Sequence, residues 1–413
     1  MFQTLRNAWK IPDLRKKMLF TLLMIVVFRL GTFIPVPGLD KAALAQLIGD
    51  GNNLFALLDA FSGGAFANAT IFAMSITPYI NSSIIMQLLT VAIPALERLA
   101  KEGEEGRKKL ASWTRYGTVI LAFVQATGLY FGLRNAVTNP GVLSFIVITF
   151  TFTAGTAFLM WLGEQITEYG VGNGISIIIF SGIVSRLPVT IYGLVENFLN
   201  GSVSVITLIV IILIAIFTVL FVVFINNAER RIPVQYAKRM VGRKMYGGQS
   251  THIPIKVAMA GVIPIIFAMS IMSFPQTIAA LIGKQWNWIN STSWWYIIIY
   301  FLLIIFFTYF YTAIQFNPIE VANNMKKNGG FVPGIRPGKP TSDFINKVLV
   351  RITLAGAVFL AFIAVLPQIL GKYVGFSIGI GGTSLLILVG VALETVRQIE
   401  SQMLMRHYKG FLE

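Results

Sequence analysis

The side chains that most often perform chemistry in proteins are scarce in this chain and widely separated. The sequence has no cysteine, which excludes disulfides, thiol catalysis, iron–sulfur clusters and thiolate zinc sites. Its two histidines, His252 and His407, both lie in basic segments between or after apolar runs, which does not support a histidine metal site or a proton relay inside a membrane. The sequence therefore predicts no metal site and no cofactor.

Enzyme motifs are equally thin. No GxxxxGK[ST] phosphate loop and no HExxH zinc pair occurs in the sequence. The glycine-rich residues 169–174 follow an apolar run instead of a strand, so a tight turn is a better interpretation than a dinucleotide site. We predict that the protein is not an enzyme and that any energy source belongs to a partner.

Two basic segments have the residue types needed to bind phosphate or acidic protein surfaces. Glycine and proline surround Arg336 within residues 328–338, and glycines flank Arg243 and Lys244 within residues 241–248. Turns of this composition would hold the guanidinium groups at projecting tips, where they can bind carboxylate or phosphate. The alternative is that these charges only reflect the excess of Lys and Arg in cytoplasmic loops, and the sequence leaves both interpretations open.

Composition places the elements that carry these residues in a membrane. The chain has 413 residues, of which 55% are apolar and only 12% charged, and its net charge is +16. Soluble domains are about a quarter charged, and about 20 apolar residues form one membrane-crossing helix. Ten apolar runs of suitable length predict an all-α polytopic membrane protein, with spans at residues 18–37, 69–94, 117–133, 142–162, 175–194, 203–225, 257–282, 295–314, 352–370 and 379–396.

A shorter apolar stretch, residues 54–66, is interrupted by Asp59 and a Gly-Gly pair and is too short to span. It predicts a re-entrant helix that packs against protein or a watery cavity. No carboxylate is expected in the middle of a span, because Glu164 and Glu168 are placed just past the fourth span and Glu394 near the end of the tenth. An ion-coupled pump is therefore less favoured.

The distribution of positive charge gives the orientation. Of the 33 Lys and Arg residues, 27 fall in the N-terminal segment, the tail and the loops after spans two, six and eight. Cytoplasmic loops accumulate such residues, so both termini are predicted to be cytoplasmic. Arg29 lies inside the first span, and Arg186 falls on the opposite side of the membrane.

Pairs of isoleucines on two spans suggest a pore. Ile76 and Ile80 are spaced i,i+4 on the second span, as are Ile175 and Ile179 at the start of the fifth, so each pair shares a helix face. Ordinary packing or lipid contact explains the same spacing. Pro78 and, on span seven, Pro264 mark positions where the backbone could bend.

The sequence resembles a known family, SecY, the channel-forming subunit of the bacterial protein translocase. The resemblance is carried by many motifs in order along nearly the whole chain. They are residues 28–38, 72–80, 160–167, 172–180, 249–252, 331–338 and 381–387.

The resemblance implies ten helices in two pseudo-symmetric halves around an hourglass pore. The halves are residues 1–195, with helices 1–5, and residues 196–413, with helices 6–10 and cytoplasmic loops at about 226–256 and 318–351. The family's constriction ring falls on Ile76, Ile80, Ile175, Ile179, Ile266 and Ile387, with Ile265 as the alternative to Ile266. Branched aliphatic side chains suit such a ring, because they exclude ions by dewetting and part around a polypeptide.

The resemblance also assigns a plug and a lateral gate. The re-entrant residues 54–66 correspond to the plug, which would cover the ring from outside; its implied members are Leu57, Phe61, Ser62, Gly63 and Gly64. The gate runs between spans two and three and spans seven and eight, which makes Gln87 and Thr90 on one side and Ser273 and Phe274 on the other the candidate lining residues. Asn81 departs from the family, where a small hydroxyl residue is more usual.

Partners and function follow from the same resemblance. The family's docking surface for the SecA ATPase motor and the ribosome matches Arg239, Arg243 and Lys244 in one loop and Arg336 in the other. Ribosomal RNA would be contacted only through the ribosome. Small SecE and SecG subunits, signal-bearing preproteins and the lipid of the bacterial cytoplasmic membrane are the other implied partners. The implied function is a protein-conducting channel that moves unfolded preproteins outward and releases membrane segments sideways. A secondary transporter of a small solute is the alternative, and a membrane-embedded enzyme is third.

Overall fold

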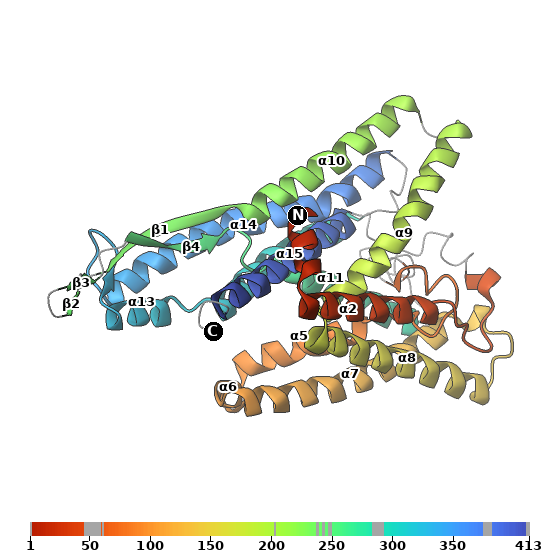
Figure 1. The fold of residues 1–413 in the computed structure, drawn as a ribbon. Coiled ribbons are helices and arrows are strands. Elements are labelled where there is room, and N and C mark those ends of the chain that lie inside the picture. Colours follow the sequence, from red (N-terminus) through yellow and green to blue (C-terminus); the bar gives the residue numbers. More distant parts are fainter. Residues whose placement is uncertain are drawn as a thin grey trace.

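The computed structural model describes residues 2–44, 59, 62–201, 204–236, 239–241, 244–246, 250–282, 293–374 and 382–409. Long helices make up most of these residues, and one small sheet and one hairpin project from one end of the bundle (Figure 1). The predicted all-α membrane architecture therefore has a β addition that the apolar runs gave no reason to expect.

The first half of the chain forms helices that pack side by side. In Figure 1, α2, α5, α7 and α8 lie together below the centre, and the N-terminus lies near the middle of the molecule. The elements are α1 (Phe2–Lys10), α2 (Pro12–Gly31), α5 (Thr77–Ala92), α6 (Pro94–Lys101), α7 (Glu104–Gly132), the short η1 (Arg134–Ala136), α8 (Val142–Tyr169) and α9 (Gly174–Leu199).

The second half forms the upper group of helices in Figure 1 and the projecting sheet. Its helices are α10 (Val205–Asn227), α11 (Ile263–Ile282), α12 (Trp294–Gln315), α13 (Pro318–Lys327), α14 (Lys339–Val374) and α15 (Gly382–Lys409). Its strands are β1 (Glu229–Tyr236), β2 (Arg239–Val241), β3 (Lys244–Tyr246), β4 (Ser250–Lys256) and β5 (Gly330–Phe331).

Within the described residues, a long helix occupies each of the ten predicted spans. Five helical segments are long and apolar enough to cross a bilayer by themselves, and a sixth results if α5 and α6, which meet at a bend of 102°, count as one. The α2 helix falls outside this set because it also carries Asp13, Arg15, Lys16, Lys17 and Arg29. The five are Val142–Tyr169, Gly174–Leu199, Val205–Asn227, Trp294–Lys327 and Lys339–Leu366.

The two halves of the chain meet along two lines of helix contact. On one line α11 packs against α5 and α7, and on the other α15 packs against α9 and α1. One hydrophobic core runs through both halves and includes Phe72 and Ile179 from the first and Phe267 and Ile387 from the second. The interior of the bundle is therefore built jointly by both halves.

The projecting sheet joins the two long basic segments of the second half. Its strand order is β4-β1-β5, with antiparallel pairs such as Ile232↔Ile253 and Gln235↔Phe331. Alternating residues of β1, Ile232 and Val234, are buried against the start of α14, while their neighbours face out. The described parts of the segments predicted as loops, at about 226–256 and 318–351, thus pack together through β1, β4, β5, α13 and the first turns of α14.

The second predicted span begins later than its apolar run. Thr70 forms a β-bridge with Pro35, residues 71–76 form turns, and α5 starts only at Thr77. Ala69 and Ser75 both have φ of +53°, a left-handed conformation that a helix cannot include. The predicted span was too long at its start because it was drawn from apolarity alone, and a buried turn and a buried helix have the same composition.

The prolines expected to bend helices instead begin them. Pro78 lies in the first turn of α5 and Pro264 in the first turn of α11, where a missing N–H leaves no hydrogen bond unmade. Two other prolines, Pro188 in α9 and Pro275 in α11, lie inside helices. The prediction of bends at Pro78 and Pro264 was therefore wrong.

The fourth helix is longer than its predicted span. The α8 helix runs to Tyr169, so Glu164 and Glu168 belong to it and do not follow it. Glu164 accepts a 2.8 Å hydrogen bond from Nε of Arg115 on α7. This pairing lets the helix continue past its apolar run, because the charge at its end has a partner.

Candidate functional site

Six isoleucines predicted as a ring belong to one hydrophobic cluster, although they come from four helices. Ile76, Ile179 and Ile387 are buried members of the cluster, and Ile80, Ile175 and Ile266 are partly buried and pack against it. Ile76 and Ile80 lie at the start of α5, Ile175 and Ile179 at the start of α9, Ile266 on α11 and Ile387 on α15. The structure therefore gathers the six from both halves of the chain.

The start of α5 is fixed by the turns before it. Ile76 is the first residue outside the helix, and its carbonyl oxygen accepts hydrogen bonds from the backbone N–H groups of Tyr79 and Ile80, both at 3.1 Å. The spacing of Ile76 and Ile80 thus corresponds to one helical turn, as the sequence predicted. Both side chains contribute to the shared core.

The start of α9 is fixed by a side-chain cap. The Asn173 side chain accepts hydrogen bonds from the backbone N–H groups of Ile175 at 3.1 Å and Ser176 at 3.3 Å. The Gly174 N–H donates to Oγ1 of Thr167 on α8 at 2.9 Å. Asparagine is a preferred N-cap because its short side chain satisfies backbone donors that the helix leaves free. The cap and this second bond place Ile175 and Ile179 in the core.

The neighbours Ile265 and Ile266 differ in burial. Ile265 is fully buried, and Ile266 is partly exposed. Both side chains belong to the same hydrophobic core.

The described part of the predicted plug is a tight turn. Gly63 and Gly64 have φ of +66° and +89°, which the sequence pair Gly-Gly allows. Gly63 lies against the backbone of α9, since a Cβ built on it would be 2.8 Å from Cα of Gly182. Ser62 closes the turn by accepting a 3.1 Å hydrogen bond from the Phe66 N–H. Leu57 and Phe61 lie outside the described residues.

Two arginines contact this turn. Arg186 on α9 forms an ion pair with Asp59, and Nη1 of Arg29 on α2 donates a 3.2 Å hydrogen bond to the Gly63 carbonyl oxygen. Sequence reasoning assigned no role to these two arginines. A signal was present, because an arginine inside or next to an apolar segment needs a partner and often marks function.

The chain that follows the turn is firmly anchored. The Val36 N–H donates to the Ala69 oxygen at 2.8 Å, and the Ile71 N–H donates to the Ile34 oxygen at 3.1 Å. Phe72 then lies between two other rings, Phe28 on α2 at 6.0 Å and Phe158 on α8 at 5.9 Å between centroids. These are further members of the site that spacing did not reveal. They hold the base of the turn to α2 and α8.

The predicted gate residues lie on two helices that contact each other. Gln87 and Thr90 are partly buried on α5, and Ser273 and Phe274 are partly buried on α11. The α11 helix packs against α5 and α7, and α12 packs against α11. The helices on both sides of the predicted gate are therefore in contact.

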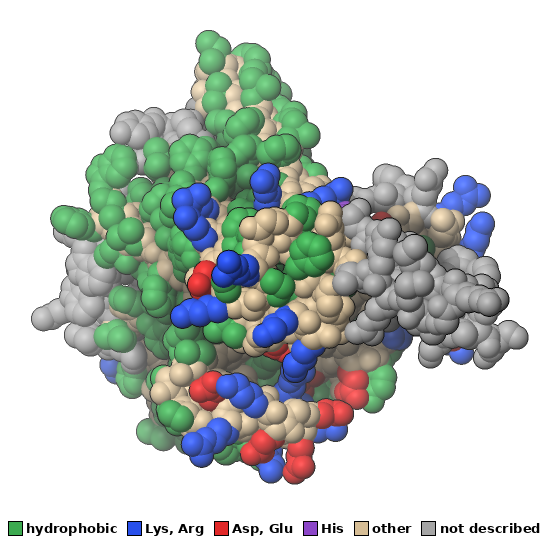
Figure 2. All heavy atoms as spheres, turned by 90° about the vertical axis from the view of Figure 1, so that its left-hand side faces the viewer, with side chains coloured by type: hydrophobic (Ala, Val, Ile, Leu, Met, Phe, Trp, Pro, Cys, Tyr) green, Lys and Arg blue, Asp and Glu red, His purple; other side chains and the backbone are tan. Residues whose placement is uncertain are grey.

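Positive charge gathers on the face from which the sheet projects. Figure 2 views this face and shows Lys and Arg side chains over its middle, with most of the visible Asp and Glu side chains near its lower edge among further Lys and Arg. Arg336 is exposed between the turns at Gly334 and Gly338, as its sequence context predicted, and its carbonyl oxygen accepts a 2.8 Å bond from Oγ1 of Thr341. Arg239 and Lys244 lie on the paired strands β2 and β3, and Arg243 lies outside the described residues.

The acidic side of that face is neutralised locally. Glu97, Glu104 and Glu105 each pair with a lysine four residues later. The hydrogen bond from Lys101 holds the pKa of the Glu97 carboxyl below its usual value. These i,i+4 pairs leave the Lys and Arg residues elsewhere on the face as the larger source of its potential.

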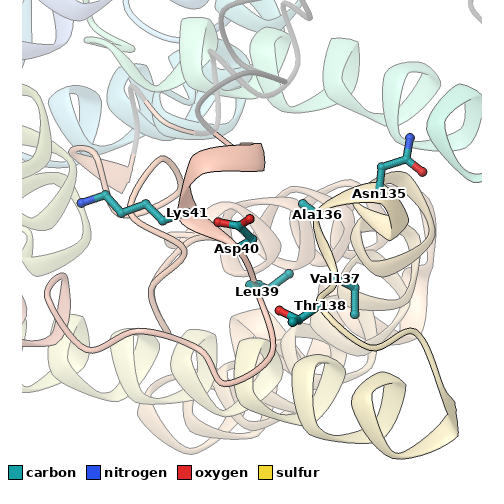
Figure 3. A pocket seen from close by; sticks show the side chains of 7 residues that line it. All are labelled: Leu39, Asp40, Lys41, Asn135, Ala136, Val137 and Thr138. Atoms are coloured by element: carbon teal, nitrogen blue, oxygen red, sulfur yellow. The ribbon is translucent and has the colours of Figure 1, made fainter.

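A separate hollow of about 400 Å³ lies where two loops meet, outside all the predicted site residues. It is lined by Leu39, Asp40, Lys41 and residues 135–138, and Figure 3 shows Lys41 extending away from the other labelled side chains. Backbone bonds join the loops, including Asp40 N–H to the Ala136 oxygen at 2.9 Å. Among the described residues, no group of three or more His, Asp or Glu could hold a metal ion.

Comparison with known proteins identifies the family. The family model SecY matches residues 70–396. The chain is 49% identical to the protein translocase subunit SecY of Halalkalibacterium halodurans, with both chains covered completely, and 46% identical to that of Escherichia coli K12, with 100% of this chain and 96% of the relative covered. The chain belongs to the SecY family.

The fold agrees with that membership. A solved structure described as "The structure of a protein conducting channel" matches with a TM-score of 0.69 at 18% identity, over 94% of this chain and 92% of the other. One described as "Sec61 in the Canine ribosome-channel complex from the endoplasmic reticulum" matches with a TM-score of 0.64 at 17% identity, over the same shares. The predicted fold class is therefore confirmed.

Family membership also decides the function class. The protein is a multi-pass membrane protein and the protein-conducting channel subunit of the Sec translocase, a transporter and not an enzyme. This confirms the first of the functions that the sequence left open and removes the small-solute transporter.

Proposed function

We propose that Ile76, Ile80, Ile175, Ile179, Ile266 and Ile387 form the constriction through which unfolded preproteins pass. The observation that carries this proposal is that the six come from four helices of both halves and share one buried cluster. A ring of isoleucine offers no hydrogen bonds to water or ions, so a narrow ring dewets and blocks them. The same side chains bind no particular sequence, which suits a path for many different polypeptides.

Residues 54–66 act in this proposal as a plug that covers the ring from the outer side. Support comes from the described part of the segment, which turns tightly at Gly63 and Gly64 and packs on α9, the helix that carries Ile175 and Ile179. A relative with this fold is described with the words "The plug domain of the SecY protein stablizes the closed state of the translocation channel and maintains a membrane seal" (TM-score 0.68, 18% identity).

The contact of α11 with α5 and α7 serves as the lateral gate. These contacts join the two halves on one side, so separating them opens a path from the ring to lipid. Gln87, Thr90, Ser273 and Phe274 are the proposed lining of that path. An apolar segment in transit then partitions sideways into the bilayer because burying apolar surface in lipid is favourable.

The basic face is the proposed docking surface for a motor or ribosome, with Arg239, Arg243, Lys244 and Arg336 as its contacts. The exposed guanidinium group of Arg336, which lies between two turns, suits phosphate or carboxylate partners. SecA and the ribosome are the proposed energy sources, and SecE and SecG the proposed small subunits. Relatives with this fold are described in complexes with canine and yeast ribosomes. Both termini and this face are proposed to be cytoplasmic, in the bacterial cytoplasmic membrane.

The test is reconstitution of the chain in vesicles with SecE, SecG, SecA, ATP and a secretory precursor. The expected result is that the precursor becomes protected from added protease only when ATP and SecA are present. The ring is tested with Ile80→Asn, which should raise resting ion flux because a polar side chain admits water, and with Ile80→Val, which should not. Absence of precursor protection would contradict the transport role, and equal flux in the two variants would contradict the ring.

A further inference from the structure

Asp59 is a buried acid in a protein whose spans carry few charges. Its side chain is 1% exposed, and it has two partners of different kinds. Arg186 of α9 pairs with its Oδ2, and the Ala67 N–H donates to its Oδ1 at 2.8 Å. A buried carboxylate needs such partners because removing it from water is costly. Asp59 therefore connects the turn at 62–67 to α9 by a charged contact, in addition to the close packing of Gly63 on Gly182.

The backbone of Asp59 also organises the turn. Its carbonyl oxygen accepts hydrogen bonds from the Gly64 N–H at 3.0 Å and from Oγ of Ser62 at 3.2 Å. One residue thus sets the shape of the turn with its backbone and fastens the turn to a neighbouring helix with its side chain. Displacing the turn from α9 requires breaking the contact with Arg186.

Arg29 provides a second cationic contact from the other side. It donates to the Gly63 oxygen from α2, and its guanidinium lies 5.8 Å from the centre of the Phe33 ring. Arg186 and Arg29 come from α9 and α2, two helices that also contact each other. The turn is held between these two arginines, but only Arg186 pairs with a full negative charge.

The contacts beyond the turn do not depend on this pair. Residues 69–71 are bonded to residues 34–36, and Phe72 stacks between Phe28 and Phe158. The part of the plug that can move away from α9 must therefore lie before residue 69. Asp59 precedes the turn in the chain and the anchor follows it, so the ion pair with Arg186 holds the end of the turn that the anchor does not hold.

We propose that the Asp59–Arg186 ion pair is a latch that holds the plug turn against α9 in the closed channel and sets the threshold for opening. The proposal rests on the proposed role of residues 54–66 as a plug. The latch is strong while its surroundings are dry, because Coulomb attraction falls as the dielectric constant rises. Water that accompanies a translocating chain weakens the pair, so the arriving substrate itself releases the turn.

The experiment measures resting ion flux through the full chain, reconstituted in vesicles with SecE and SecG. Arg186→Gln leaves the buried Asp59 without its charged partner, and Asp59→Asn leaves the partly exposed Arg186 without one. We expect resting flux to rise about tenfold in each, a modest value because the Arg186 side chain is 35% exposed. Arg186→Lys keeps the charge at a similar length and should stay within about threefold of the parent. Asp40→Asn, at an exposed acid, is the matched control and should leave the flux unchanged.

A double variant separates a latch from two independent residues. If the pair acts as one unit, Asp59→Asn combined with Arg186→Gln leaks no more than the worse single variant, because the second change removes an unpaired group. If the flux increases of the two single variants multiply in the double variant, the latch is wrong. Equal flux in Arg186→Lys and Arg186→Gln would also overturn it. Correct assembly of every variant is checked by recovery of the complex with SecE and SecG.

Deletion of residues 60–66 distinguishes failure of the latch from failure of the plug. If the deletion raises resting flux and the point variants do not, the plug stands and the latch is wrong. If the deletion leaves flux at the parent level, the proposed plug itself is wrong. A precursor with a weakened signal should also be carried better by Arg186→Gln than by the parent, and no gain in its transport would contradict a threshold set by this pair.

Discussion

The close approach of Gly63 to α9 gives a prediction with an internal control. A Cβ at Gly63 would lie 2.8 Å from Cα and 3.0 Å from the oxygen of Gly182, both backbone atoms that cannot rotate away. A Cβ at Gly64 would meet nothing closer than 3.7 Å, the Nε of Arg186. Both glycines have positive φ, so alanine at either position pays the same kind of penalty, about 1–2 kcal/mol for a left-handed residue.

The difference between the two alanine variants therefore isolates the packing of the turn on α9. To reach an ordinary contact of 3.4 Å, the turn in Gly63→Ala must move away from Gly182 by about 0.6 Å. Overpacking of this kind costs about 1–3 kcal/mol. An energy of about 1.4 kcal/mol corresponds to a factor of ten in population. The fraction of channels in which the turn has moved away from α9 should therefore be about 5-fold to 150-fold larger in Gly63→Ala than in Gly64→Ala.

The assay is anion flux through vesicles that contain the reconstituted channel without a substrate. We expect Gly63→Ala to leak more than Gly64→Ala by at least the lower of these factors, at equal amounts of assembled complex. Thermal unfolding of both variants in detergent checks that the difference does not come from misfolding. Fluxes within about twofold of each other would refute the reasoning, because the backbone contact would then not contribute to the seal.

Three further predictions concern the anchor, a helix junction and the basic face. Phe72→Ala should lower the free energy of unfolding by about 3–5 kcal/mol, because it removes a buried ring stacked between two others; thermal unfolding measures this, and a loss no larger than that of Phe72→Leu would contradict it. Thr21→Val should cost about 1–3 kcal/mol in the same assay, because the buried Val171 N–H would lose its 3.0 Å bond to Oγ1, and Thr21→Ser should restore most of it. Arg336→Glu should weaken SecA-driven transport and leave membrane insertion of the channel intact, with Lys41→Glu as the control; unchanged transport would remove the docking role of Arg336.

The sequence predicted much of the membrane architecture because apolar runs and charge counts report directly on a bilayer. Every predicted span contains a helix, and the exposed position of Arg336 followed from its glycines and prolines. The errors occurred where apolarity was ambiguous. Residues 71–76 are mostly apolar but form turns, and Pro78 and Pro264 start helices, because hydropathy does not distinguish a buried turn from a buried helix.

The projecting sheet shows a different limit. The alternation of Ile232 and Val234 was visible in the sequence, but their partners, Ile253 and β5, lie about 20 and 100 residues further along the chain. A strand is stabilised by its neighbours across the sheet, so a short alternating segment specifies its partners only when the chain has folded.

The sequence by itself determined the solvent in which the chain folds, the distribution of its charge and, through its motifs, its family. Those properties depend on composition and on local order. The tertiary structure alone decided which side chains share a site: six isoleucines from four helices in one core, Arg29 and Arg186 on either side of one turn, and Gly63 against α9. Arg29 and Gly63 are 34 positions apart, and Gly63 and Gly182 are more than 100 apart, so the energies of such contacts arise only when packing brings the atoms within contact distance.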